Sequence, residues 1–368
     1  MNPPSSRIPR FLAVVSLALV AALAAPFASA KPTVSVTPDT AELLYSGRIE
    51  RHGAKQVTMG WSGARIRMRF KGTAVTMKMT AENHENSVVV WVDGKSTKKL
   101  RLDAADGVYS LAADLVPGEH TVEVVRATEG MVGLIQFRGF ILGDGGTVLP
   151  WGAEPDRRIL FVGDSITCGY GVEAEDPNEH FTPATENFCE NYTGLTVRAL
   201  QADYMVVARS GIGMLRNYDG PRDGSPDAMP MVYPHLFFKQ EKPMWDPAQF
   251  VPHLICINLG TNDFSTKGVN EAKYVEAYAA FAGNLLVQYP DAKLVLLQGP
   301  MNNSDALRDA LAQVQSKLAE KAPGRVTYFE LSAQGALGFG ADWHPNRAQS
   351  KKNAAELIPY LSKLMGWE

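Results

Sequence analysis

Residues 159–167 read Ile-Leu-Phe-Val-Gly-Asp-Ser-Ile-Thr, a short apolar run that ends at a glycine and two polar residues. Further apolar runs of strand length follow, and amphipathic patterns with helical spacing separate several of them. These runs cover residues 205–208, 254–259, 294–297 and 326–329. Alternation of strands and helices predicts a parallel sheet with helices on both faces. We therefore expect an α/β domain over residues 157–368.

The preceding part of the chain has a different period. Residues 65–70 alternate Arg with Ile, Met and Phe, and residues 75–80 alternate Val and Met with Thr and Lys. Because successive side chains of a strand point to opposite faces, each strand should have one apolar and one solvent-facing side. Many short strands with no helical stretch predict an all-β sandwich or jelly roll over residues 31–145. The glycine-rich segment 143–146 and the prolines after it mark the boundary.

Composition and charge exclude several classes of protein. The 368 residues are 45% hydrophobic and 20% charged, which is typical of a globular chain rather than a disordered or fibrous one. The formal net charge is −3. Without a basic surplus, neither nucleic acid nor an anionic membrane surface is an expected partner.

The N-terminus indicates export. Arg7 and Arg10 precede an apolar run over residues 11–25, and Ala28-Ser29-Ala30 follows. These are the parts of a cleavable secretory signal peptide, predicted here as residues 1–30. The alternative is an uncleaved anchor, but the run is shorter than the about 20 residues that span a bilayer. The mature protein is therefore expected to be secreted or periplasmic and free of the membrane.

Residues with catalytic potential follow three predicted strands or precede the last helix. Ser165 follows the first strand, Gly211 the second and Asn262 the third, and His344 precedes the last helix. The carboxyl ends of parallel strands meet at one edge of a sheet, so these residues should converge. Acyl transfer needs such a set: a hydroxyl nucleophile, a base and fixed donors for an oxyanion. Each motif taken alone also has a simpler structural explanation. Asp164 and Ser165, for example, could simply cap a helix.

These residues also carry a family resemblance. Gly163-Asp164-Ser165, Gly211, Gly260-Thr261-Asn262-Asp263 and His344 resemble, in order, the four sequence blocks of the SGNH (GDSL-like) hydrolases. With the upstream sandwich and the stretches 163–171 and 210–213, the chain is similar to carbohydrate esterase family 2, the acetylxylan esterase-like enzymes. The resemblance implies a three-layer α/β/α flavodoxin-like hydrolase domain behind a jelly-roll domain. It also implies an exported enzyme that deacetylates plant polysaccharides.

The resemblance assigns roles to individual residues. Ser165 is expected to be the nucleophile and His344 the general base. The N–H groups of Ser165 and Gly211 and the side chain of Asn262 are expected to form the oxyanion hole. The family's usual acid lies three residues before the histidine, where this chain has an alanine, so Asp342 is the expected third member. A backbone carbonyl in its place is the alternative.

Other side chains have less specific signals. Trp343 could stack on a sugar ring or pack the loop against the core. Cys168 and Cys189 could form a disulfide in an oxidising compartment, or all three cysteines, including Cys256, could stay reduced. The scattered ligand types and the absence of an H-E-x-x-H motif predict neither a metal nor another cofactor.

The sequence therefore predicts an exported serine esterase that removes O-acetyl groups from xylan or glucomannan through an acetyl-enzyme, with an acetylated polysaccharide or oligosaccharide as its partner. One alternative is an exported lipase, thioesterase or arylesterase with the same catalytic set. Others are an esterase of bacterial cell-wall acetyl groups and a non-catalytic glycan-binding protein. Oligomeric state and any glycan binding by the sandwich are left open.

Overall fold

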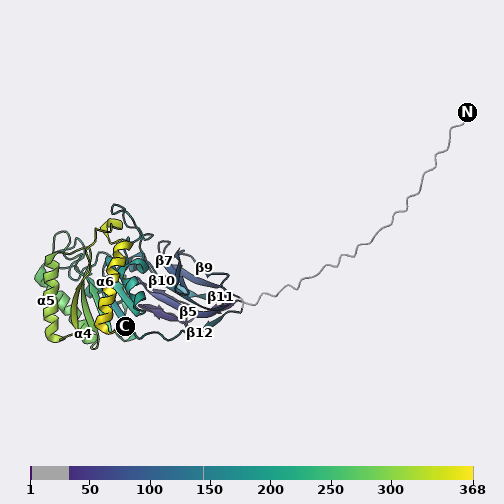
Figure 1. The fold of residues 1–368 in the computed structure, drawn as a ribbon, viewed down its shortest axis with the longest axis horizontal. Coiled ribbons are helices and arrows are strands. Elements are labelled where there is room, and N and C mark those ends of the chain that lie inside the picture. The colour runs from purple at the N-terminus through teal and green to yellow at the C-terminus, as the bar shows by residue number, and fades with distance from the viewer. Residues whose placement is uncertain (2–32, 144, 368) are drawn as a thin grey trace. The chain divides into compact units, whose positions relative to one another are not determined.

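The computed structural model describes Met1, residues 33–143 and residues 145–367. Apart from Met1, the predicted signal peptide lies outside the described residues. Figure 1 shows antiparallel strands in purple and blue, followed by strands and helices in teal to yellow. In the described part of the chain, no helix has both the length and the apolar character of a membrane span.

Two antiparallel sheets form the N-terminal region, as the period-two pattern predicts. The first contains, in spatial order, β3 (Ile49–Arg51), β4 (Val57–Met59), β11 (Ile135–Leu142), β6 (Val75–Ala81) and β9 (Gly107–Ala112), with β1 (Val34–Val36) paired to β11. The second contains β12 (Thr147–Leu149), β5 (Arg65–Gly72), β10 (Gly118–Arg126), β7 (Ser87–Val92) and β8 (Lys95–Arg101), with β2 (Leu44–Ser46) paired to β5. The apolar side chains of both sheets share one core, so the region is a sandwich.

One expectation about β5 is wrong. Arg65 and Arg67, predicted to face solvent, are buried. Arg65 Nη2 lies 3.2 Å from Asp203 Oδ1, and its guanidinium carbon lies 4.9 Å from the ring centroid of Tyr204. These two partners are the first two residues of β14 (Asp203–Ala208). The α/β region therefore covers this end of the sandwich, which periodicity within one strand cannot show.

The C-terminal region is built on a five-stranded parallel sheet. Its spatial order is β14, β13 (Arg158–Gly163), β17 (Leu254–Asn258), β18 (Lys293–Gln298) and β19 (Val326–Glu330). All five strands lie where the apolar runs predict them. Helices α4 (Glu271–Gln288) and α5 (Asp305–Lys321) pack on one face, and α2 (Tyr192–Ala199) and α6 (Arg347–Met365) on the other. The three-layer α/β/α prediction is confirmed.

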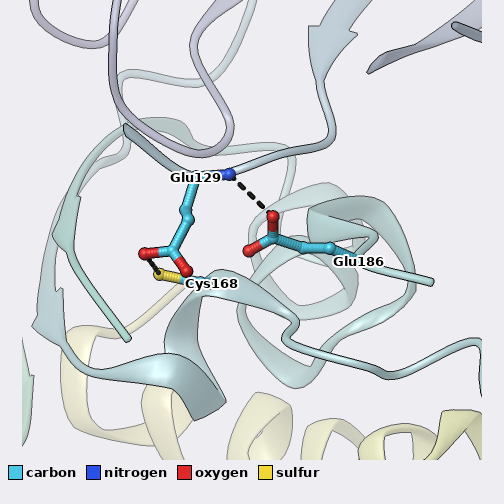
Figure 2. Close-up of side chains that lie close together, drawn as sticks. All are labelled: Glu129, Cys168 and Glu186. Atoms are coloured by element: carbon cyan, nitrogen blue, oxygen red, sulfur yellow. Dashed lines mark hydrogen bonds between the residues drawn. The ribbon is translucent and has the colours of Figure 1, made fainter. Parts of the chain in front are cut away.

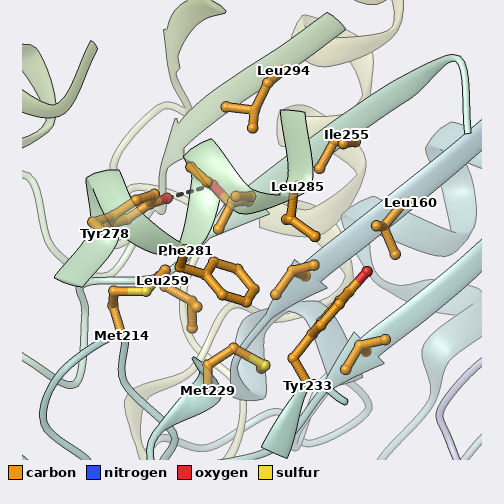
Figure 3. Packing of buried hydrophobic residues seen from close by; sticks show 14 of the residues in the cluster. Leu160, Met214, Met229, Tyr233, Ile255, Leu259, Tyr278, Phe281, Leu285 and Leu294 are labelled. Carbon is orange, nitrogen blue, oxygen red and sulfur yellow. Dashed lines mark hydrogen bonds between the residues drawn. The ribbon is translucent and has the colours of Figure 1, made fainter. Parts of the chain in front are cut away.

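The apolar faces of the helices explain this packing. In Figure 3, Tyr278, Phe281 and Leu285 of α4 point toward the side chains of the sheet. Met214, from the loop after β14, is fully buried in the same cluster and so anchors that loop. Asn346 caps α6 by accepting a hydrogen bond from the Gln349 N–H at 2.9 Å.

Shorter elements complete the two regions. They are α1 (Ser165–Cys168), α3 (Met229–Val232), the hairpin β15 (His235–Phe237) and β16 (Gln240–Met244), and the 3-10 turns η1 (Gly130–Val132), η2 (Phe188–Glu190), η3 (Pro247–Gln249) and η4 (Ala341–Trp343). Because β14, β13 and β17 are neighbours, the loops at their carboxyl ends lie together at one edge of the sheet.

Candidate active site

Ser165 occupies a sharp strand-to-helix turn. Strand β13 ends at Gly163 and α1 begins at Ser165. A Cβ at Gly163 would lie 2.1 Å from Thr167 Oγ1, so only glycine allows the chain to turn this tightly. Asp164 caps the helix, accepting from the Ile166 N–H at 3.0 Å. The capping explanation is thus correct for Asp164, while the Ser165 hydroxyl lies in a cavity.

His344 contacts that hydroxyl. Its Nε2 lies 2.9 Å from Ser165 Oγ, although the two residues are 179 positions apart. Its Nδ1 lies 3.2 Å from the carbonyl oxygen of Ala341 and 3.1 Å from that of Asp342. Carbonyl oxygens only accept hydrogen bonds, so the proton of the neutral ring belongs on Nδ1. Nε2 is then free to accept the serine proton.

The surroundings of His344 keep it neutral. Burial lowers its pKa to about 4, against the opposing effect of the Asp342 and Ala341 carbonyls. The ring also lies against Tyr170, with 4.1 Å between the two centroids. At neutral pH the imidazole is therefore uncharged and able to act as a base.

The carboxylate of Asp342 does not contact His344, contrary to the expected triad. It accepts hydrogen bonds from Tyr170 Oη at 2.8 Å and the Phe181 N–H at 2.9 Å, and His180 Nδ1 lies 3.0 Å from its second oxygen. Burial raises the pKa of Asp342, but these contacts outweigh it and hold that pKa below its usual value. The carboxylate is engaged by these partners and makes no hydrogen bond to the imidazole.

The local backbone explains how Asp342 still serves the site. Asp342 has φ +47° and Trp343 has φ +62°, both in the left-handed region that residues with a Cβ rarely adopt. The three partners of the Asp342 side chain hold this turn in place. As a result, the carbonyls of Ala341 and Asp342 face Nδ1 of His344, which is the alternative that the sequence left open.

The two predicted donors, Gly211 and Asn262, line the same cavity as Ser165 and His344. Gly211 follows β14 with φ +76°, a conformation that favours glycine. Asn262 follows β17 and is 7% exposed. Its Nδ2 donates to the Ile212 carbonyl at 2.8 Å, which fixes the direction of the amide group.

The loops that carry these donors are tied together. The Asp263 carboxylate accepts from the N–H groups of Met214, Leu215 and Arg216 at 2.8–2.9 Å. The buried Arg216 guanidinium donates in return to the carbonyls of Asp263 and Ser265, at 3.0 and 2.8 Å. Burial raises the pKa of Asp263 to about 6, although its N–H donors act in the opposite direction. The two loops are therefore held in one fixed arrangement.

The cavity measures about 530 Å³ and has further lining residues. Sequence reasoning missed Tyr170 and Tyr218, both of which line it. Tyr170 lies in the stretch 163–171, which carries part of the family resemblance, whereas nothing in the sequence singled out Tyr218. Trp343 is 54% exposed, packs edge-on against Phe339 at 5.0 Å and is not part of the cavity lining. All three cysteines are buried free thiols.

Comparisons with known proteins agree with this architecture. Residues 45–151 match the family model described as carbohydrate esterase 2 N-terminal, and residues 161–352 match that of the GDSL-like lipase/acylhydrolase family. The cellulase/esterase CelE of Acetivibrio thermocellus is 33% identical over 342 residues, covering 90% of this chain and 41% of CelE. The chain thus spans about two fifths of that relative's length. An acetylxylan esterase/glucomannan deacetylase of Cellvibrio japonicus is 29% identical, with 91% of this chain and 92% of the relative covered.

Solved structures show the same similarity. A family two carbohydrate esterase from Clostridium thermocellum, in complex with cellohexaose, superposes with a TM-score of 0.84 at 31% identity, covering 89% of this chain and all of that one. One from Cellvibrio japonicus gives a TM-score of 0.81 at 28% identity, covering 91% and 99%. Both the sandwich and the parallel-sheet region therefore have counterparts in these structures.

Proposed function

The chain belongs to carbohydrate esterase family 2, and from this premise we propose that it is an exported serine esterase that removes O-acetyl groups from plant cell-wall polysaccharide, such as xylan or glucomannan. The observation that carries the proposal is the 2.9 Å contact between His344 Nε2 and Ser165 Oγ, with Nδ1 of the same ring held by backbone carbonyls. The names of the relatives support the substrate class. The basic and apolar N-terminal sequence supports export.

Acylation follows from this geometry. His344 Nε2 takes the Ser165 proton while Oγ forms a bond to the acetyl carbonyl carbon. The negative charge that develops on the carbonyl oxygen is stabilised by the N–H groups of Ser165 and Gly211 and by Asn262 Nδ2. The bond to the sugar oxygen then breaks, and His344 gives its proton to that oxygen. Acetyl-Ser165 remains.

Deacylation repeats the steps with water. His344 takes a proton from a water molecule, whose oxygen attacks the acetyl-Ser165 carbonyl. The same donors stabilise the second oxyanion. When the bond to Ser165 Oγ breaks, His344 returns the proton to that oxygen and acetate leaves. Every proton moves through one nitrogen atom, so neither step requires a second side-chain base.

The decisive experiment compares substrates. Purified protein is incubated with acetylated xylan, acetylated glucomannan and a long-chain 4-nitrophenyl ester, with Ser165→Ala as the inactive control. The proposal expects acetate release from at least one polysaccharide and much slower cleavage of the long-chain ester, and NMR of the product identifies the hydroxyl position. Preference for the long-chain ester would indicate a lipase. Glycan binding without hydrolysis would contradict the esterase proposal.

A further inference from the structure

A buried cluster of acidic and thiol side chains lies behind the wall of the cavity. It consists of Glu129, Cys168 and Glu186, which are 1%, 0% and 0% exposed, and one ligand atom of each lies within 4.8 Å of the others. Figure 2 shows the three side chains converging from separate segments. Glu129 comes from the sandwich, at the start of η1, while Cys168 ends the helix that begins at Ser165. We call this set the buried acid cluster.

Glu129 reaches the loop that carries Gly211. Its Oε2 accepts a hydrogen bond from the Ser210 N–H at 2.8 Å. Ser210 lines the active-site cavity and directly precedes Gly211. Glu129 is not among the residues that line this cavity. Cys168 Sγ lies 3.8 Å from the same oxygen. One carboxylate oxygen of the sandwich thus contacts both the proposed oxyanion loop and the nucleophile's helix.

The sandwich holds Glu129 firmly. Arg126 is fully buried, and its guanidinium donates to the carbonyl oxygens of Glu129, Thr128 and Met59, each at 2.8 Å. The backbone N–H of Glu129 donates in turn to Glu186 Oε2 at 2.9 Å. With both backbone groups of Glu129 fixed, the direction of its side chain toward Ser210 is also constrained.

Electrostatics favour a single negative charge in the cluster. Burial raises the pKa of both Glu129 and Glu186, and two neighbouring carboxylates in a low-dielectric interior resist double ionisation. Glu186 Oε1 has no hydrogen-bond partner, whereas Glu129 Oε2 faces the Ser210 N–H donor. The charge is therefore better placed on Glu129, with the proton on Glu186. A bound cation would have to compete with the N–H groups of Ser210 and Glu129, which already donate hydrogen bonds to one oxygen of Glu129 and one of Glu186.

We propose that Glu129 is a positioning residue of this esterase: the sandwich supplies a carboxylate that holds the Ser210 N–H and thereby fixes the Gly211 N–H toward the oxyanion. This inference rests on the proposed function. It makes the sandwich a structural part of the active site.

Three substitutions test this role. Glu129→Gln keeps the length of the side chain and an acceptor oxygen, so kcat for 4-nitrophenyl acetate should stay within about fivefold of wild type. Glu129→Asp shortens the side chain and draws the acceptor oxygen away from the Ser210 N–H, and Glu129→Ala removes the acceptor. Since loss of a whole oxyanion donor costs about 10²–10³ in rate, they should lower kcat about 10- to 100-fold with little change in KM. Affinity for a phenylboronic acid, which mimics the tetrahedral oxyanion, should fall in parallel.

Glu123→Ala is the matched control. Glu123 also lies on the sandwich and pairs across the domains with Arg198 at 3.4 Å, but it does not line the cavity. The Glu123→Ala variant should keep kcat near the wild-type value even if its melting temperature is lower. If Glu129→Ala does not fold, the Asp and Gln pair still decides the question.

Several outcomes would overturn the inference. The first is a wild-type kcat in Glu129→Asp, and the second is an equal loss of kcat in the Gln and Ala variants. The third is a stoichiometric metal in the purified protein whose removal by EDTA abolishes activity. The last result would make the cluster a cation site. An inactive wild type would instead refute the proposed function, whereas an active wild type with an inactive Ser165→Ala variant and unaffected Glu129 variants would refute only this inference.

Discussion

His344 and Asp342 are two residues apart, yet they meet through the backbone: the ring Nδ1 lies 3.1 Å from the Asp342 carbonyl oxygen, while the Asp342 carboxylate is directed at Tyr170, His180 and Phe181. The imidazole is therefore oriented by neutral carbonyl groups. Among the described residues, no carboxylate is hydrogen-bonded to the ring, and the Asp342 carboxylate favours the protonated imidazole only through a smaller coulombic effect. This difference from a triad has measurable consequences.

The first prediction concerns Asp342→Asn. In a triad with a side-chain carboxylate, replacing the acid by its amide lowers kcat by about 10⁴. Here the carboxylate acts mainly by holding a turn and makes no hydrogen bond to the ring, so we expect a loss of about tenfold or less in kcat for 4-nitrophenyl acetate. Tyr170→Phe removes a single donor to that carboxylate and should have a smaller effect. A loss close to 10⁴ for Asp342→Asn would show that the carboxylate supports the imidazole directly.

The second prediction concerns pH. Only neutral His344 can accept the Ser165 proton, so kcat/KM should rise with pH through the pKa of His344 and stay high above it. Burial lowers this pKa from 6.5 to about 4, so the enzyme should remain fully active at pH 6. A pH profile of kcat/KM, with rates corrected for inactivation, measures this limb. An acid limb centred near 6.5 would contradict the buried position of the ring.

The same shift predicts a loss of stability in acid. The unfolded chain takes up the His344 proton near pH 6.5, before the folded protein does near pH 4. The free energy of unfolding should therefore fall as pH decreases between these values. Denaturant titrations of wild type and His344→Gln at both ends of this range isolate the contribution, which should be absent from the variant. An equal loss in the two proteins would assign it to other groups.

Much of this site is predictable because parallel strands share a direction. Ser165, Gly211 and Asn262 each follow a strand of one sheet, so strand order alone brings them to one edge. The direction of the Asp342 carboxylate is not predictable in this way, because it depends on two left-handed residues and on Tyr170 and Phe181, which contact it only in the folded chain.

The contacts between domains account for the remaining differences. The alternation in β5 correctly identifies its apolar face, but Arg65 is buried because Asp203 and Tyr204 lie over the other face. Glu129 was missed for the same reason, since its partner Ser210 lies in the other region of the chain. A pattern within one segment carries no information about the surface that later packs on it.

The fourth prediction concerns Asn262. Removing its amide by Asn262→Ala should lower kcat about 10²–10³-fold and change KM little, because the donor acts on charge that develops in the transition state. Asn262→Asp also removes the amide donor and places a carboxylate beside the oxyanion, so it should be at least as slow. Steady-state kinetics on 4-nitrophenyl acetate measure both. A change confined to KM would show that Asn262 only binds substrate.

The fifth prediction compares two exposed aromatic residues. Tyr218 is 61% exposed and lines the cavity, whereas Trp343 is 54% exposed and does not line it. Since a sugar next to the scissile ester could pack on the ring of Tyr218, Tyr218→Ala should raise KM for acetylated polysaccharide severalfold without affecting 4-nitrophenyl acetate. Trp343→Ala should have the smaller effect on polysaccharide KM. The reverse order would place the sugar on the Trp343 side of the site.

The most direct test of the account is identification of the covalent intermediate. Protein quenched in acid during turnover of 4-nitrophenyl acetate is digested, and its peptides are analysed by mass spectrometry. The account predicts an acetyl group on the peptide that contains Ser165, and no such adduct in Ser165→Ala, which should also be inactive. An acetyl group on another residue, or full activity in Ser165→Ala, would contradict it.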